Sequence, residues 1–255
     1  MNFIIILESL KFYRLRHERT IQLWFVLLYA LNIMIFFLPA VDTDFTAVYK
    51  VLEDLSGSQL ANTSLETLLT PGNWLYLGLT VAVNALNGFF ILMYAALFVG
   101  EADSLPPRQS VLKCLAALPR LLLLALLLVI PALISVLFFM IPIIIFGMMM
   151  YFLPLNLAIS RHSLTEAMHQ SFLSTNRQKL FIFIQVMMLS IVISLPRTLI
   201  LMIIPLTEIP FAILTTFFTV LQVFIQGRLM GILYLFLVKK VPLVITSKPN
   251  DQKPL

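Results

Sequence analysis

The stretch SRHSLTEAMHQSF, residues 160–172, gathers side chains that could bind a metal ion. His162 and His169 are seven residues apart, so they would share one face of a helix, with Glu166 between them. Imidazole and carboxylate groups are ordinary zinc ligands. However, Ser163 followed three residues later by Glu166 is also a capping box, which would use the glutamate to begin a helix. Because a further ligand is then missing, we expect a solvated helix face rather than a metal site.

Asp42-Thr43-Asp44 resembles the D-x-D pattern of metal-using glycosyltransferases. It directly follows an apolar run, where acidic residues on the outer side of a membrane are ordinary. The sequence has no nucleophile elbow, zinc-protease helix, Walker loop or dinucleotide-binding fingerprint. Its single cysteine, Cys114, excludes an internal disulfide framework and a cysteine-rich zinc cluster. We therefore expect no catalytic residue, no metal site and no cofactor, and a protein that is not an enzyme.

Two pairs of amides interrupt the apolar runs. Asn84 and Asn87 are three residues apart, and Gln222 and Gln226 are four apart, so each pair would lie on one face of a helix. Such side chains either hold helices together through interhelical hydrogen bonds or contact a ligand, and the sequence leaves both readings open. No aspartate or glutamate lies within these runs, which argues against a proton-driven carrier.

Arg228 is the one charge deep in an apolar run, and an intramembrane charge is by default a functional hypothesis. It also lies near enough to the inner surface to extend toward lipid phosphates. Leu195-Pro196-Arg197 interrupts the run at residues 180–205, so Arg197 and Glu208 would flank the outer turn before the last run and can pair there.

The elements that position these residues follow from composition. The 255 residues are 60% hydrophobic and 11% charged, far more apolar than a water-soluble domain. A membrane-spanning helix needs about 20 apolar residues. Five runs qualify, and the third is long enough for two spans with a turn near residues 138–142. The runs are residues 20–40, 73–99, 121–160, 180–205 and 209–238. We predict an all-α, polytopic membrane protein with about six transmembrane helices and interfacial amphipathic helices.

The distribution of charge predicts the orientation. With the N-terminus inside, 15 of the 17 lysines and arginines fall on the inner side, while half of the 12 acidic residues fall outside. This asymmetry indicates that both termini are cytoplasmic in a multi-pass protein of the cell membrane. It also explains the net charge of +5 by contact with the phospholipid bilayer, so we expect no nucleic acid partner. Residues 1–240 would form a single transmembrane domain and residues 241–255 a flexible cytoplasmic tail.

Three segments outside the spans have helical apolar spacing. We expect an N-terminal amphipathic helix over residues 3–19, another over residues 107–118, and a short interfacial helix in the outer loop, residues 41–72. The opening stretch would form a fourth, an interfacial linker helix before the fifth span. Its defining residues are Arg161, Ser163, Glu166 and Arg177.

Residues 104–188 resemble a bacterial six-helix membrane family. A basic-led hydrophobic hairpin with central prolines precedes a linker of the form S-x-x-E-A-x-x-x-S and a few basic residues. The linker residues are Ser163, Glu166, Ala167 and Ser171, followed by Arg177 and Lys179. This pattern is similar to YciC-type proteins and to the membrane domain of some glycerophosphodiester phosphodiesterases. The chain has Pro131-Ala132 where that family usually has Pro-Gly. The resemblance implies a fold and a bacterial plasma membrane rather than a reaction.

The start of the chain, residues 7–37, resembles the elbow helix and first span of export-type ABC permeases. The segment GEADSLPPRQS keeps Glu101 but lacks their acidic-Gly-Thr pattern. Two hypotheses follow. The chain is a non-enzymatic envelope protein for membrane maintenance, self-protection or assembly with other membrane proteins, or it is a permease subunit that binds an ATPase subunit. A membrane-embedded lipid enzyme would need a polar cluster that the sequence does not reveal.

Overall fold

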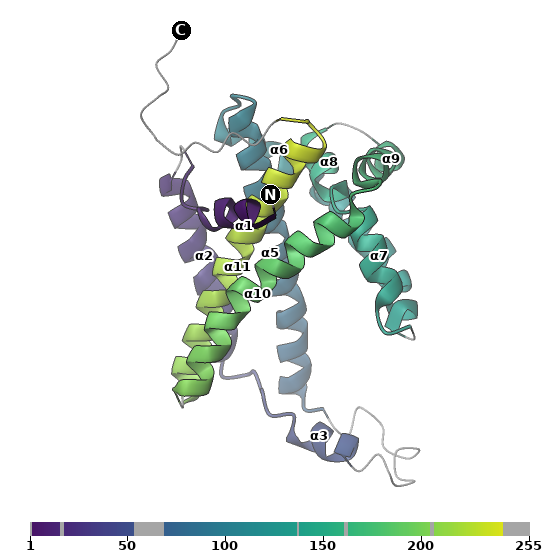
Figure 1. The fold of residues 1–255 in the computed structure, drawn as a ribbon. Helices are drawn as coiled ribbons and strands as arrows, with labels where there is room; N and C mark the ends of the chain where they lie inside the picture. Colours follow the sequence, from purple (N-terminus) through teal and green to yellow (C-terminus); the bar gives the residue numbers. More distant parts are fainter. Residues whose placement is uncertain are drawn as a thin grey trace. The chain divides into compact units, whose positions relative to one another are not determined.

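The computed structural model describes residues 2–15, 18–53, 69–136, 138–160, 163–204 and 207–241, and these form helices and connecting turns (Figure 1). The helices of these ranges are α1 (Asn2–Leu10), α2 (Glu18–Phe37), α3 (Thr46–Glu53), α5 (Pro71–Ala102), α6 (Pro107–Val136), α7 (Ile141–Met149), α8 (Leu153–Ile159), α9 (Leu164–Thr175), α10 (Lys179–Ile203) and α11 (Glu208–Leu237).

Six helical segments of the described chain are long and apolar enough to cross a membrane, which confirms the predicted fold class. Five are single helices, namely α2, α5, α6, α10 and α11, and the sixth is the pair α7 and α8 over Ile141–Ile159. The reason is simple: a helix rises about 1.5 Å per residue, so about 20 apolar residues match the hydrocarbon core. The chain is therefore a multi-pass membrane protein.

The helices divide into two compact units. Unit 1 contains residues 1–11, 92–188 and 226–255, and unit 2 contains residues 12–91 and 189–225. The long helices α5, α10 and α11 each contribute residues to both units. Each unit has its own packing and is described by itself.

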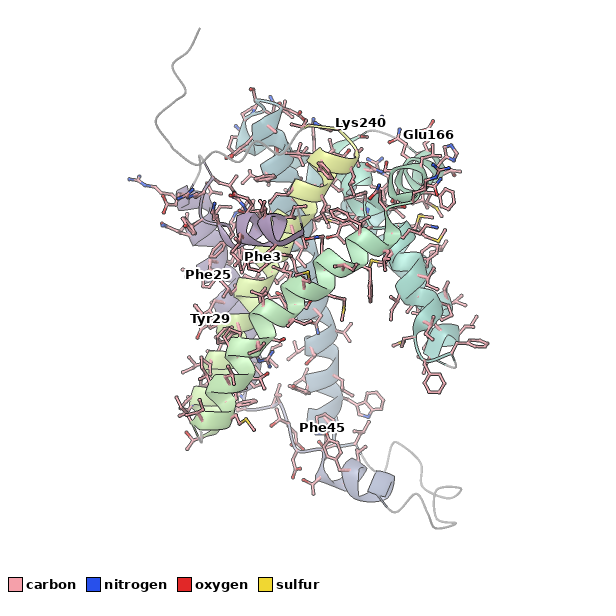
Figure 2. The ribbon with its side chains drawn as sticks, in the orientation of Figure 1. Phe3, Phe25, Tyr29, Phe45, Glu166 and Lys240 are labelled. Atoms are coloured by element: carbon pink, nitrogen blue, oxygen red, sulfur yellow. The ribbon has the colours of Figure 1, made fainter. Side chains whose placement is uncertain are left out.

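Aromatic side chains form much of the packing of unit 2. Phe25 of α2 lies with its ring centroid 5.9 Å from that of Phe217 and 5.7 Å from that of Phe224 on α11. Trp24 packs edge-on against Phe90 of α5 at 6.0 Å. Phe25 and Tyr29 project from the same helix in Figure 2, and the Tyr29 hydroxyl donates to a backbone carbonyl of α11 at 3.4 Å. These contacts join α2 to α5 and α11.

In unit 1, α6 and α7 form the predicted hairpin, with its turn at residues 138–140. Ser135 anchors this turn: its carbonyl oxygen accepts from the Met140 amide at 2.8 Å, and its Oγ accepts from the Ile143 amide at 2.9 Å. Phe139 and Met140 have φ of 53° and 62°, in the left-handed region that reverses the chain direction.

The fourth span is broken between α7 and α8, and this break was not predicted from the sequence. Helix α7 ends at Met149 and α8 begins at Leu153. Because Pro154 has no N–H, the Met150 carbonyl instead accepts from the Leu153 amide at 2.9 Å, which tightens the chain. The Met149 carbonyl accepts from the Thr175 hydroxyl of α9 at 2.9 Å and from the Ser171 hydroxyl at 3.3 Å. Side chains of α9 therefore satisfy a carbonyl that the break releases.

The predicted N-terminal helix over residues 3–19 is too long. Helix α1 ends at Leu10, the next amide, that of Lys11, donates to the Glu8 carbonyl at 3.2 Å, and α2 begins at Glu18. Such an i→i−3 hydrogen bond is typical of a helix that tightens and ends.

Two further expectations are corrected, because prolines do not end helices here. The segment over residues 107–118 is not a separate interfacial helix but the first part of α6, which continues through Pro119 and Pro131. Likewise, Pro196 lies inside α10 rather than interrupting it. Prolines are better tolerated in membrane helices, where neighbouring groups satisfy the released carbonyls.

Polar side chains order the described part of the segment between α2 and α5. Helix α3 confirms the short helix expected in this segment, and residues 54–68 lie outside the described residues. The Thr70 hydroxyl donates to Asp42 Oδ2 at 2.8 Å, and Asn73 Nδ2 donates to the carbonyls of Asp42 and Asp44 at 2.9 and 3.0 Å. The aspartates of the D-x-D pattern are thus hydrogen-bonded to residues around the start of α5, which holds this segment in place.

The linker helix is present as α9. Ser163 Oγ accepts from the Glu166 amide at 3.3 Å, and Glu166 Oε2 accepts from the Ser163 amide at 2.9 Å, which is the predicted capping box. Figure 2 labels Glu166 at this helix. Arg177, with φ of 63°, lies in the turn after α9, whereas Arg161 lies outside the described residues. Ala167 of α9 joins a buried apolar cluster with residues of α6 and α8.

Candidate functional site

Unit 2 contains a pocket of about 310 Å³ with a mixed polar and apolar lining. Its walls come from α2, α5, α10 and α11. The polar side chains that line it include Asn32, Thr80, Asn84, Arg197, Thr216 and Thr219. So many polar groups in apolar helices are unusual, because each must be satisfied without bulk water. The pocket is therefore the strongest candidate site in the described part of the chain.

The pocket lies toward one end of all four helices. Its residues of α2 precede the helix end at Phe37, and its residues of α5 and α11 follow their starts at Pro71 and Glu208. Arg197 is six residues before the end of α10, about 9 Å along the helix axis. These are the helix ends joined by residues 38–70 and 204–207, which the charge distribution predicts to face outward.

Asn84 and Asn87, which are one turn apart on α5, have different surroundings. Asn87 is buried, and its Nδ2 donates to Asn32 Oδ1 while Asn32 Nδ2 donates to Asn87 Oδ1, both at 3.0 Å. This closed amide pair joins α2 to α5. Asn84, one turn earlier, is exposed and lines the pocket. Asn87 therefore holds helices together, whereas the amide of Asn84 faces a space that a ligand can enter.

Threonines supply much of the remaining polarity. The hydroxyls of Thr215 and Thr219 donate to carbonyls one turn earlier, at 2.8 and 2.9 Å. A threonine hydroxyl that donates in this way keeps lone pairs with which it can accept. Arg197 adds a donor that stays charged. The lining can thus both donate to and accept from a bound polar group.

Arg197 was expected at the outer turn, but the structure places it inside α10 and in the pocket wall. The side chain of Glu208 lies outside the described residues, so the pairing of these two residues stays a prediction.

The described lining has no carboxylate, histidine, lysine or cysteine. General acid–base catalysis and most nucleophilic catalysis depend on such groups. Elsewhere in the described ranges, no three His, Cys, Asp or Glu side chains are grouped to hold a metal ion, although His162 is not among these residues. The described lining therefore offers hydrogen-bonding and apolar contacts to a guest.

The other candidate residues lie outside this pocket. Gln222 and Gln226 are half-buried on α11, in unit 2 and unit 1 respectively. Arg228, in unit 1, is buried, and its Nε donates to the Glu8 carbonyl of α1 at 2.8 Å. Its guanidinium lies 5.0 Å from the centre of the Phe98 ring and also hydrogen-bonds to the Tyr94 hydroxyl. It contacts protein groups and holds the C-terminal turn of α1, where a positive charge is favourable.

Sequence reasoning passed over two buried amides in unit 1. Gln185 of α10 is fully buried, and neither of its side-chain polar atoms has a hydrogen-bond partner in the described structure. Asn156 of α8 donates to the Ala167 carbonyl at a long 3.4 Å, while its Oδ1 has no described partner. The sequence signal that could have identified them is that each is the single amide of its apolar run.

No protein-family model, curated protein or solved structure matches the chain. The two family resemblances therefore stay predictions.

Proposed function

We propose that the chain is a non-enzymatic protein of the bacterial plasma membrane that acts by binding a guest in the pocket of unit 2. Membrane maintenance, self-protection and assembly with other membrane proteins are the roles that such binding serves. The observation that carries the proposal is the half-polar pocket within apolar helices, whose described lining lacks the groups of acid–base catalysis.

The lining fits an amphiphilic guest, such as a lipid or a membrane-active peptide. Ile35, Phe36, Val83 and Phe211 provide apolar walls beside the polar groups. A polar group that enters a membrane interior without partners costs several kcal/mol, roughly 2–7 for a neutral group. Asn84, Arg197 and the threonines can supply those partners.

The test is native mass spectrometry of the purified full chain, which detects lipids that copurify with it. We expect Asn84→Leu with Thr216→Val to remove the lipid that the pocket holds, so that fewer lipids copurify with each chain, while the fold is kept. Ser194→Ala is the matched control, because Ser194 is an exposed polar residue of α10 outside the pocket. Equal retention by the pocket variant and the control would contradict the proposal, as would pocket-dependent turnover of a lipid.

One observation favours the alternative, a permease subunit of an export-type ABC transporter. The polar surface of α9 has a hollow of about 320 Å³ formed by Thr165, Glu166, His169 and Gln170. The predicted orientation places it in the cytoplasm, where an ATPase subunit would bind. Copurification of a stoichiometric ATPase, lost on His169→Ala with Gln170→Ala, would support this function and contradict the first.

A further inference from the structure

Another hollow, which shares no residue with the pocket in unit 2, lies in unit 1 between α6 and α8. It has a volume of about 400 Å³. One wall is formed by Leu112, Lys113, Ala116 and Arg120 of α6. The facing wall is the C-terminal end of α8, Leu157 to Ile159, followed by Ser160. We call this hollow the α6–α8 groove.

The two cations of the groove share one face of α6. Lys113 and Arg120 are seven residues apart, which is close to two helical turns and about 10 Å along the axis. Ala116 lies between them on the same face and leaves room for a guest. The groove therefore combines two positive charges with an apolar floor and an apolar facing wall.

The groove lies at the depth at which both helices change from apolar to polar. Helix α6 has 30 residues, about 45 Å, and its charges lie at Arg108, Lys113 and Arg120, before the charge-free residues 121–136. Helix α8 ends at Ile159, where the chain leaves the apolar run. Since the hydrocarbon core is about 30 Å thick, this change marks the boundary between acyl chains and headgroups.

Asp103 lines a small hollow that adjoins the groove and shares Lys113 with it, but the Asp103 carboxylate is paired with Lys239. No described acidic side chain forms an ion pair with Lys113, which is exposed. A positive charge at this depth favours an anionic partner.

From these observations we infer that the α6–α8 groove binds an anionic phospholipid. The lipid phosphate lies against Lys113 and Arg120, and the start of an acyl chain lies along Ala116 and Leu157. An arginine guanidinium donates two parallel hydrogen bonds to a phosphate, while a lysine contributes a compact charge. Basic hollows between membrane helices at the cytoplasmic side are suited to such headgroups. The predicted orientation places the site in the inner leaflet.

The experiment measures lipid binding to the purified full chain by native mass spectrometry, with phosphatidylglycerol and phosphatidylcholine as probes. We expect the wild type to prefer phosphatidylglycerol. Lys113→Gln with Arg120→Gln should weaken that binding about 30-fold and leave phosphatidylcholine unchanged. The matched control is Arg108→Gln, which removes a charge from the same helix at an exposed position outside the groove.

A second variant tests the groove without changing charge. Ala116→Trp should fill the space between the two cations and reduce phosphatidylglycerol binding by a similar factor, and Lys113→Arg should keep it. An equal loss in Arg108→Gln would mean that diffuse surface charge attracts the lipid, which would overturn the inference. Full binding by both groove variants, or displacement of the lipid by inorganic phosphate alone, would overturn it as well. None of these residues lines the pocket of unit 2, so failure here leaves the proposed function standing.

Discussion

Asn32 and Asn87 show how polar side chains of two apolar helices can satisfy each other's hydrogen bonds. Each amide uses its carbonyl oxygen and one N–H in the reciprocal pair, and Asn32 Nδ2 also donates to the Leu28 carbonyl of its own helix at 2.8 Å. Both polar atoms of each side chain are thus hydrogen-bonded. Asn84 has no such partner on the facing helix and lines the pocket.

Replacing one member of this pair should destabilise unit 2. Asn87→Leu leaves the Asn32 amide buried without its partner, which should cost about 1–2 kcal/mol, near the upper end for interhelical hydrogen bonds in membranes. The loss is measured as a lower midpoint of thermal unfolding in detergent. The double variant Asn32→Leu with Asn87→Leu should recover most of it, because no amide is then stranded. A double variant less stable than either single variant would contradict this account.

Gly100 leaves little room for a side chain. A Cβ added at Gly100 would lie 2.2 Å from Ser110 Oγ and 3.4 Å from Ser110 Cβ. Gly100→Ala should therefore destabilise the protein by about 1–3 kcal/mol through overpacking. Gly100→Ala with Ser110→Ala should restore stability, because only the hydroxyl clashes. Gly78→Ala in the same helix is the control: nothing lies within 4 Å of its added Cβ, so thermal unfolding should not be lowered.

At the scale of elements, α9 depends on its capping box. Ser163→Ala removes the side chain that accepts from the Glu166 amide and should cost about 0.5–2 kcal/mol. The first turn of α9 should then exchange its amide hydrogens faster, as measured by hydrogen–deuterium exchange. Ser174→Ala is the control, because its hydroxyl donates to a carbonyl of the same helix at 2.7 Å and caps neither end. Unchanged exchange in Ser163→Ala would contradict the role of the cap.

Helix α1 depends on Arg228. Arg228→Ala removes the donor to the Glu8 carbonyl and the cation above Phe98, so α1 should detach from the rest of unit 1. Hydrogen–deuterium exchange should then increase throughout α1, while α9 keeps its protection. Arg228→Lys keeps the charge but lacks the Nε–H, so it should restore only part of the protection. Equal protection of α1 in Arg228→Ala would show that apolar contacts alone hold the helix.

Elements that depend on residues close together in the sequence could be predicted, whereas elements that depend on distant residues could not. The apolar runs and the capping box at Ser163 are local patterns, so the sequence indicated six spans and the start of α9. The break before α8 was missed because it depends on Pro154 together with hydroxyls of Ser171 and Thr175 from another helix. In the same way, Asn84 and Asn87 could be predicted to share one helix face. The residue that distinguishes them is Asn32, which hydrogen-bonds to Asn87. Asn32 lies 55 positions before Asn87, and no sequence pattern marked it as a partner.

At the scale of the whole molecule, the charge asymmetry predicts which leaflet each site faces. With the basic segments inside, the pocket residues would face the outer leaflet and the α6–α8 groove would face the inner leaflet. An inverted chain would exchange the two leaflets. Labelling of single thiols measures both the orientation of the chain and the number of crossings between two chosen positions.

Cysteine accessibility suits this measurement, because Cys114 is the only cysteine of the sequence and is buried. In a Cys114→Ala background, Thr43→Cys and His169→Cys place single thiols at exposed positions before and after α5, α6 and the α7–α8 pair. Three crossings put these thiols on opposite sides. A membrane-impermeant maleimide should label Thr43→Cys in intact cells and His169→Cys only after permeabilisation. The reverse labelling pattern would show that the chain has the opposite orientation. Labelling of both thiols in intact cells would mean that only two of the three segments cross the bilayer. The broken α7–α8 segment would then enter and leave the bilayer on the same side.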